Sequence, residues 1–249
     1  MTAAIFAAQA GAKSVVVEKN ATAGRKLLLT GGGRCNLTHI CSIDEFVRIY
    51  ESGGRFLRHC LYEFSPDETL DFFSGLGVET KAEQDPSSLR YAGAGGCVFP
   101  ASERAGDVRD ALVKRCEELG VQFNFGRGAE RVEKRDVGFA VFTGREIVTA
   151  QNVIIAAGGK SYPQTGSTGD GYKLAKLLGH TIIEPKAALV PLVAEGKWCA
   201  ELAGTSLDKV KISAMVGGKP FDSAQGRKVC VTGPLVFTQD GIGRPAVLD

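Results

Sequence analysis

The sequence predicts an α/β fold over its larger first part, followed by a β-rich second part. Short, mainly apolar runs at Ser14–Val17 and Val153–Ala157 lie between segments rich in helix formers. Such runs are typical of parallel strands that helices cover on both faces. From about Ala187 onward the pattern changes to short, weakly alternating runs separated by Gly-Gly and Gly-Pro turns. We therefore expect two domains, residues 1–186 and 187–249.

The N-terminal elements have the order of half a nucleotide-binding unit. Residues 2–10 are helix formers, and Gly11 suits the position after a helix end. The strand Ser14–Val17 follows and ends in Glu18. In a nucleotide-binding βαβ unit, an acid at the end of the second strand accepts hydrogen bonds from a ribose. On these residues alone, a ribose-binding acid and a solvated strand end fit Glu18 equally well.

The next region reads as helical from residue 43 to residue 75. Ser65, Pro66 and Glu68 form a capping box with proline at the first helical position. Ser102 can cap a further helix, which Gly120 would close.

Strands and one more helix are expected in the middle of the chain. Apolar runs separated by charged turns predict strands near Gln122–Phe125, Arg131–Glu133 and Phe139–Phe142. The run Val153–Ala157 predicts another strand, and it ends in a Gly-Gly pair. A loop rich in Gly, Ser and Thr leads from there into a helix over Asp170–Leu178.

Composition excludes several classes of protein. The chain has 249 residues, 44% hydrophobic and 23% charged, and its net charge of +2 comes from interspersed acids and bases. No basic face for nucleic acid is expected. The seven cysteines contain no C-x-x-C pair, and the three histidines have no ligand-like spacing, so we expect reduced thiols and no metal. No leader peptide or membrane span is recognised, which favours a cytoplasmic protein.

Glycine is over-represented and clustered. The chain has 32 glycines, well above the average of about 7%. The stretch GRKLLLTGGGRCNLTH, Gly24–His39, holds three in a row. Consecutive glycines let backbone amides approach an anion with no side chain in the way. Gly158-Gly159, taken alone, is more often a simple turn.

Four stretches carry a family resemblance: VVVEKNATAGRKLLLTGGGRCNLTH, GGCVFPASERAGDV, VIIAAGGKSYPQTGSTGDGYKLAKLLGH and ALVPL. They resemble the BaiN-like flavoproteins, also catalogued as the aminoacetone-oxidase family, and the likeness runs along the whole chain. The resemblance implies a glutathione-reductase-like FAD-binding Rossmann domain with a β-rich inserted domain. It also implies oxidoreductase activity on a small-molecule substrate, with either a nicotinamide (NADH or NADPH) or an organic electron donor.

The resemblance also implies roles for residues. Glu18 would bind the adenosine ribose, the nearby cations would line the ADP half, and the triple-glycine turn would pass along the pyrophosphate and flavin. Arg34 would neutralise pyrophosphate charge, with a purely structural loop contact as its alternative. The residues expected to contact FAD are Glu18, Lys19, Arg25, Lys26, Thr30, Gly31, Gly32, Gly33, Arg34, Cys35, Asn36, Ala129, Ala157, Gly158, Gly159, Gly169 and Asp170.

The sequence also departs from the family pattern. The glycine-rich turn expected before Met1 and the returning part of the FAD domain after Asp249 are missing, so an FAD domain truncated at both ends is expected. Cys97 stands where the family usually has arginine, and Ala129 where it has a larger apolar residue.

Two alternatives to a flavin oxidoreductase remain open. The first is a non-catalytic remnant without tight flavin binding. The second is a flavin-linked disulfide reductase using Cys35 and Cys41. On a helix, a spacing of six sets two residues about 9 Å apart along the axis, and a disulfide needs Cα atoms within about 7 Å. A loop could still bring them together. The sequence assigns no catalytic acid or base and no oligomeric state.

Overall fold

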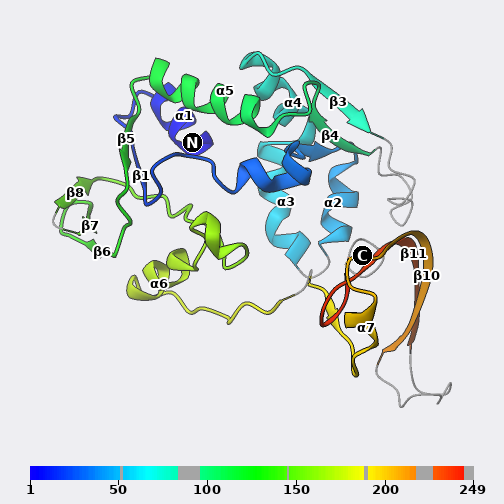
Figure 1. Cartoon of the computed structure of the whole chain (residues 1–249). Coiled ribbons are helices and arrows are strands. Elements are labelled where there is room, and N and C mark those ends of the chain that lie inside the picture. Colours follow the sequence, from blue (N-terminus) through cyan, green and yellow to red (C-terminus); the bar gives the residue numbers. More distant parts are fainter. Residues whose placement is uncertain (51–52, 84–95, 145, 188–189, 217–226, 244–249) are drawn as a thin grey trace. The chain divides into compact units, whose positions relative to one another are not determined.

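The computed structural model describes residues 1–50, 53–83, 96–144, 146–187, 190–216 and 227–243. The chain divides into two compact units, Met1–Ile182 and Ile183–Asp249 (Figure 1). None of the described helices is long and apolar enough to cross a membrane. The assignment of residues 1–186 to a partial FAD-binding domain and of 187–249 to an inserted domain stays a prediction.

A parallel strand pair carries Glu18 in the first unit. β1 (Val15–Glu18) pairs with β5 (Gln122–Phe125), and Glu18 lies opposite Phe125. Both strands were expected from the sequence. The prediction that the first is buried on both faces is wrong, since Val15 is 41% exposed. Among the described residues, β5 is the only strand paired with β1.

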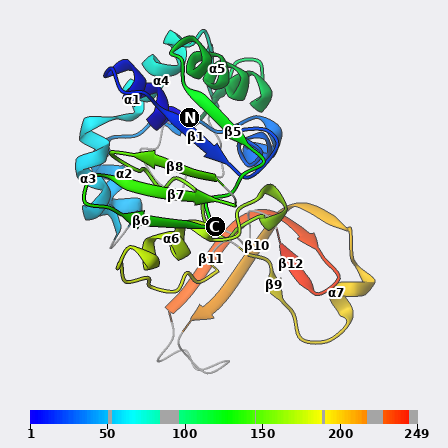
Figure 2. The ribbon, with the colours of Figure 1, turned by 90° about the vertical axis from the view of Figure 1, so that its left-hand side faces the viewer.

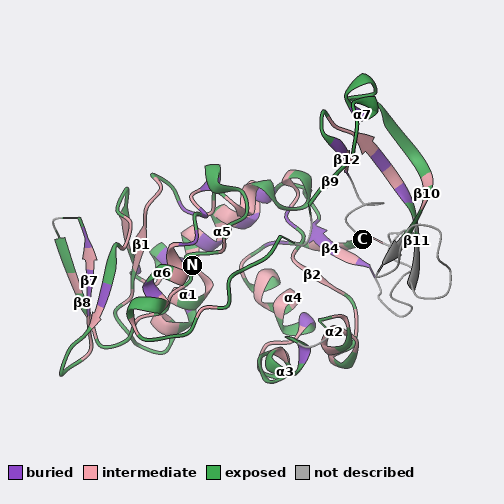
Figure 3. Ribbon diagram, turned by 90° about the horizontal axis from the view of Figure 1, so that it is seen from below, coloured by how far each residue is buried: buried purple, intermediate pink, exposed green. Residues whose placement is uncertain are grey.

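Two helices form the core beside this pair. Ile5 of α1 (Thr2–Gln9) and Val108 and Leu112 of α5 (Ala105–Glu118) belong to one buried cluster. Figure 3 shows buried positions along α5. Each such side chain stabilises the fold by about 1.5–3 kcal/mol through its removal from water.

The ends of α1 and α5 match the sequence prediction, whereas the start of α5 does not. Gly11 and Gly120 follow α1 and α5 with φ of +86° and +72°, a region that favours glycine. The predicted cap at Ser102 is wrong. The helix begins at Ala105, and Arg104 precedes it without a side-chain cap.

The predicted helical region contains three helices, α2 (Ile43–Ile49), α3 (Gly54–Glu63) and α4 (Pro66–Gly75). The capping box at the start of α4 is confirmed. Glu68 N donates to Ser65 Oγ at 3.2 Å, and Ser65 N donates to the Glu68 carboxylate at 2.6 Å.

A small antiparallel sheet was not predicted. Its strand order is β2 (Thr38–His39), β4 (Cys97–Pro100) and β3 (Thr80–Glu83). Its strands are two to four residues long and pair across large separations in sequence. The strands are therefore too short for a periodic pattern of hydrophobic residues to reveal them.

A second antiparallel sheet contains β6 (Arg131–Lys134), β7 (Phe139–Thr143) and β8 (Glu146–Ala150) (Figure 2). The first two strands were expected, and β8 was not. The helix α6 (Asp170–Leu177) begins where the sequence predicts it.

The apolar run Val153–Ala157 is not a strand, contrary to the prediction. Val153 and Ile155 pack against the buried cluster that includes Leu174 of α6. Ile154, between them, is 68% exposed. The run therefore buries alternate side chains against α6 and the second sheet without pairing as a strand.

The second unit is mainly β-structure. It contains β9 (Leu192–Val193), α7 (Trp198–Glu201), β10 (Ser206–Val216), β11 (Arg227–Phe237) and β12 (Gly241–Gly243). The sheet order is β10-β11-β12-β9.

The expectation of short strands in this part is wrong for its two longest members. β10 and β11 each have 11 residues and pair antiparallel over most of their length. The dipeptide Gly233-Pro234, expected as a turn, lies inside β11. The expected Gly-Gly turn at residues 217–218 lies outside the described residues.

Candidate functional site

The carboxyl end of β1 presents a carboxylate with one oxygen available. Glu18 Oε1 accepts hydrogen bonds from the Asn20 backbone N at 2.9 Å and from Asn20 Nδ2 at 2.7 Å. Within the described residues, Glu18 Oε2 has no hydrogen-bond partner. The half-buried Glu18 can therefore accept further donors, such as ribose hydroxyls, without losing its bonds to Asn20.

The glycine-rich loop before α6 lies directly against this strand end. Asn20 Nδ2 also donates to the Thr165 carbonyl at 3.1 Å. A Cβ added at Gly166 would lie 2.7 Å from Asn20 Nδ2, and its φ is +93°. The loop and the strand end are thus held together by a contact between residues that are 145 positions apart in the sequence.

An ion pair adds a second link between the two segments. Lys19 Nζ donates to Asp170 Oδ2 at 2.5 Å and to Thr168 Oγ1 at 2.8 Å. This donation by Lys19 holds the pKa of the Asp170 carboxyl below its usual range, and the Thr168 hydroxyl acts in the same direction. Both charged side chains are about 30% exposed (31% and 30%).

Replacing Asp170 by asparagine is expected to lower the free energy of unfolding by roughly 0.2–1 kcal/mol near neutral pH. Because the folded-state pKa is lowered, this stabilisation is present above the unfolded pKa of about 3.9. It is lost as the pH falls through the folded value. Urea unfolding at pH 6 and pH 3 measures the difference, with Asp136→Asn as a control at an exposed turn. An equal loss at both pH values would contradict the ion-pair account.

Arg25 beside the strand end and Lys26 beside the loop before α6 have no acidic partner among the described residues. Arg25 Nη1 donates to Asn20 Oδ1 at 3.1 Å, and Lys26 Nζ donates to Ser161 Oγ at 3.3 Å. Within the described residues, neither side chain forms a salt bridge. Two positive charges held by neutral groups suit an anion such as a pyrophosphate.

The triple-glycine turn ends the short 3₁₀ segment Leu27–Gly33. Gly31, Gly32 and Gly33 all have positive φ, of +56°, +68° and +91°. A Cβ at Gly31 would lie 2.8 Å from the Phe99 ring and 3.0 Å from Asn36 N, whereas one at Gly32 would meet nothing within 4 Å. The turn therefore packs at its first glycine and leaves open space beside its second.

Two amides that follow the turn are already bonded. Arg34 N donates to the Gly31 carbonyl at 3.4 Å, and Cys35 N donates to the Thr30 carbonyl at 3.0 Å. Thr30 Oγ1 donates to the Leu27 carbonyl at 2.6 Å. These bonds fix the turn, so any anion would have to be held by amides other than those two.

Arg34 contacts protein groups that offset its charge. Its Nη1 donates to both carboxylate oxygens of Glu83 on β3, at 2.9 and 2.8 Å, and its guanidinium lies 3.9 Å from the centre of the Phe99 ring. Glu103 is 3.9 Å away. This geometry favours the interpretation that Arg34 holds the loop in place. The neutralisation of a pyrophosphate by Arg34 stays a prediction.

The remaining expected residues fall into two places. Ala129 follows a loop whose Arg127 N donates to the Glu18 carbonyl at 3.1 Å. Gly159 accepts a bond from Gly169 N at 3.0 Å, which closes the loop that starts at Ala157-Gly158. Both loops therefore meet the end of β1. The turn from Thr30 to Asn36 contacts β3 through Arg34 and lies against Phe99 of β4 at Gly31.

The cysteine pair lacks the features of a reactive dithiol. Cys35 and Cys41 are both free thiols. Burial raises the pKa of Cys35, against a weaker opposing hydrogen bond from Thr30. Burial, followed by the charge of Glu45, raises the pKa of Cys41. Catalytic thiols have lowered pKa values, so the raised pKa values of Cys35 and Cys41 do not favour a disulfide reductase.

This set of groups fits FAD. A carboxylate with a spare acceptor suits the ribose, two cations without acidic partners suit the pyrophosphate, and the space beside Gly32 admits a ligand. Sequence reasoning missed Asn20, which joins Glu18, Arg25 and the loop at Thr165. Its position two residues after a strand-ending acid is a signal that could have identified it.

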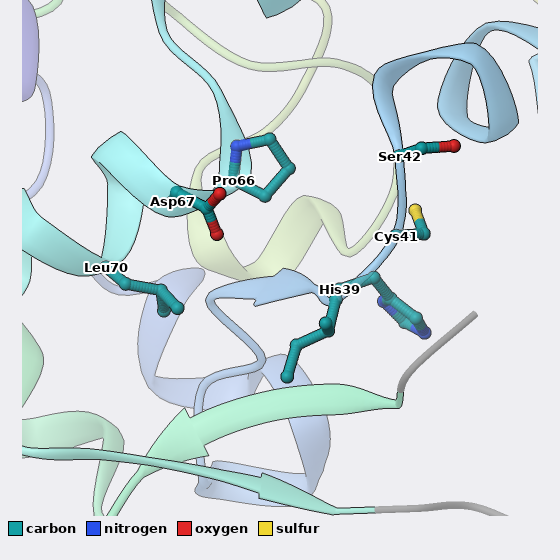
Figure 4. A pocket seen from close by; sticks show the side chains of 7 residues that line it. His39, Cys41, Ser42, Pro66, Asp67 and Leu70 are labelled. Carbon is teal, nitrogen blue, oxygen red and sulfur yellow. The ribbon is translucent and has the colours of Figure 1, made fainter. Parts of the chain in front are cut away.

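Two cavities in the structure are lined by none of the residues expected to contact FAD. One, of about 390 Å³, lies between β2 and the starts of α2 and α4 (Figure 4). The other, of about 940 Å³, lies between β6, β7 and α6. In the part of the chain that the structure describes, no group of three or more His, Cys, Asp or Glu residues could hold a metal ion.

Comparisons with known proteins identify relatives. Residues 1–242 match the family model described as the HI0933-like protein Rossmann domain. The 3-dehydro-bile acid delta(4,6)-reductase of Clostridium scindens is 32% identical over 219 residues, covering 87% of this chain and 50% of that protein. The ribosomal RNA dihydrouridine synthase of Escherichia coli is 27% identical, over 100% of this chain and 56% of that protein.

The chain spans about half the length of these curated relatives. Among solved structures, Thermovibrio ammonificans THI4 superposes with a TM-score of 0.37 at 14% identity. That match covers 63% of this chain and 52% of the other.

Proposed function

Because the chain belongs to the HI0933-like Rossmann-domain family, a family of FAD-dependent oxidoreductases, we propose that it binds FAD and reduces a small organic acceptor. We also propose that it belongs to the BaiN-like subfamily and takes electrons from NADH or NADPH. The observation that carries the proposal is the strand end itself. There, an acceptor on Glu18 lies near two cations without acidic partners, Arg25 and Lys26.

The proposal gives the residues distinct tasks. Glu18 accepts hydrogen bonds from ribose hydroxyls through Oε2, while Asn20 holds its other oxygen in place. Arg25 and Lys26 offset the charge of the pyrophosphate. Charged partners make such hydrogen bonds about twice as strong as neutral ones. FAD, when bound, supplies the hydride chemistry.

The names of the two relatives support a class of acceptor. A delta(4,6)-reductase of a 3-dehydro bile acid and a dihydrouridine synthase both denote reduction of a carbon–carbon double bond conjugated with a carbonyl group. We propose the same bond type as the acceptor here. A small molecule is favoured over RNA because acids and bases are interspersed and the net charge is only +2.

The proposal is tested with the purified chain. It is incubated with FAD, freed of unbound flavin by gel filtration, and reduced by light without oxygen. Addition of 2-cyclohexenone is expected to restore the visible absorbance of the flavin. Repeating the reduction with NADH or NADPH in place of light identifies the donor.

Two results would contradict the proposal in different ways. A chain that retains no flavin would be the non-catalytic alternative. A chain that retains flavin, but is reoxidised by oxygen and not by the enone, would have a different acceptor. Uridine-containing RNA, added in a parallel reaction, then tests the second relative's substrate.

A further inference from the structure

A histidine, a cysteine and a glutamate lie side by side across the small sheet β2-β4-β3. His39 on β2 is directly opposite Cys97 on β4, and Glu83 on β3 is opposite Cys97 on the other side. Directly opposite residues of antiparallel strands project from the same face. The three side chains therefore form a row with the thiol at its centre.

The thiol and the imidazole are within hydrogen-bonding distance. Cys97 Sγ lies 3.3 Å from His39 Nε2, and the pair is half-buried. A nucleophile within reach of a base is the arrangement that activates cysteine in enzymes. When the imidazole takes the thiol proton, the resulting imidazolium stabilises the thiolate, which is the reactive form.

His39 borders an open cavity. His39, Cys41 and Ser42 line one part of the cavity of about 390 Å³, and Asp67 and Leu70 of α4 line another. Figure 4 shows the His39 and Asp67 side chains on the two elements that bound this space. A small molecule in the cavity would therefore lie next to His39, the residue whose ring contacts Cys97.

Among the described residues, cations offset the acid that lies beside the pair. Glu83, the nearest acid on β3, is bound by Arg34 at 2.8 Å, and Lys81 is 3.9 Å from it. Asp67 faces the cavity from α4, and Cys41 from the segment after β2. The cation at Arg34 offsets the Glu83 carboxylate, the acid that would otherwise disfavour a negative sulfur.

We propose that Cys97 is a nucleophilic thiol, activated by His39, that adds to alkenes conjugated with a carbonyl group. The Sγ–C bond forms at the β-carbon while the C=C π bond breaks. The thiol proton passes to His39 Nε2 and then to the α-carbon, so no oxidant, reductant or leaving group is needed. No residue of the pair belongs to the expected FAD site, so this inference stands apart from the proposed function.

The test uses N-ethylmaleimide, itself a carbonyl-conjugated alkene, on the purified 249-residue chain at pH 6.5. Peptide mass spectrometry follows the modification of each cysteine over time. Cys60, which is exposed on α3, is the internal reference. A tenfold increase in the thiolate fraction lowers the intrinsic nucleophilicity of the sulfur about threefold. The net gain in reaction rate is therefore about threefold. Cys97 is therefore expected to react at least about threefold faster than Cys60.

A His39→Gln variant separates activation from simple exposure. It is expected to reduce the Cys97-to-Cys60 rate ratio at least about threefold, while the Cys60 rate itself is unchanged. Two outcomes would overturn the proposal. One is a Cys97 rate no higher than that of Cys60 in the unmodified chain, which decides the matter even if the variant fails to fold. The other is an unaltered ratio in a folded variant.

Discussion

Replacing Gly32 by alanine is expected to weaken FAD binding by roughly 5- to 150-fold, because an added methyl group in a filled site costs about 1–3 kcal/mol. An alanine Cβ at this position meets no protein atom within 4 Å. The space beside it is therefore open to the ligand that the triple-glycine turn is expected to contact. Quenching of flavin fluorescence during titration measures the dissociation constant.

Gly11→Ala is the matched control for this change. Gly11 has a φ of +86° and likewise no atom within 4 Å of an added Cβ. Both substitutions should lower the free energy of unfolding by a similar amount, about 1–2 kcal/mol, through left-handed backbone strain. Only Gly32→Ala should change the FAD dissociation constant. Equal FAD affinities in the two variants would remove Gly32 from the site.

Replacing Glu18 by glutamine is expected to weaken FAD binding by roughly 10- to 150-fold, since hydrogen bonds to a charged group contribute about 1.5–3 kcal/mol. Glutamine can still accept the two bonds from Asn20 through one oxygen. Its amide NH₂, however, cannot accept from a ribose hydroxyl. The variant should therefore keep the local fold and lose the ligand contact.

Glu63→Gln makes the same chemical change at an exposed position on α3. It should leave both the dissociation constant and the free energy of unfolding unchanged. If Glu18→Gln binds FAD as tightly as Glu63→Gln does, the Glu18 carboxylate does not bind the ribose. Glu18 is then only a solvated residue at the end of β1.

The sequence predicted the features that short-range chemistry determines. The capping box at Ser65, the glycine after α5 at Gly120 and the strand β1 all depend on a few consecutive residues. The role proposed for Glu18 rests on the same kind of signal, because an acid at a strand end is a local pattern.

The contacts that define the site depend on distant residues and could not be predicted. The partner of Arg34 is Glu83, 49 positions away, and the partner of Lys19 is Asp170, 151 positions away. Likewise, the apolar run Val153–Ala157 has the composition of a strand, yet it packs by its side chains against Leu174 and its neighbours. Tertiary packing overrides local preference there.

The most direct test of the central claim is a crystal structure of the chain with FAD. The account predicts the adenosine ribose within about 3 Å of the Glu18 carboxylate. It also predicts the pyrophosphate beside Arg25 and Lys26, with the loop before α6 against it. Electron density for FAD elsewhere on the protein, with Glu18 contacting only Asn20, would contradict it.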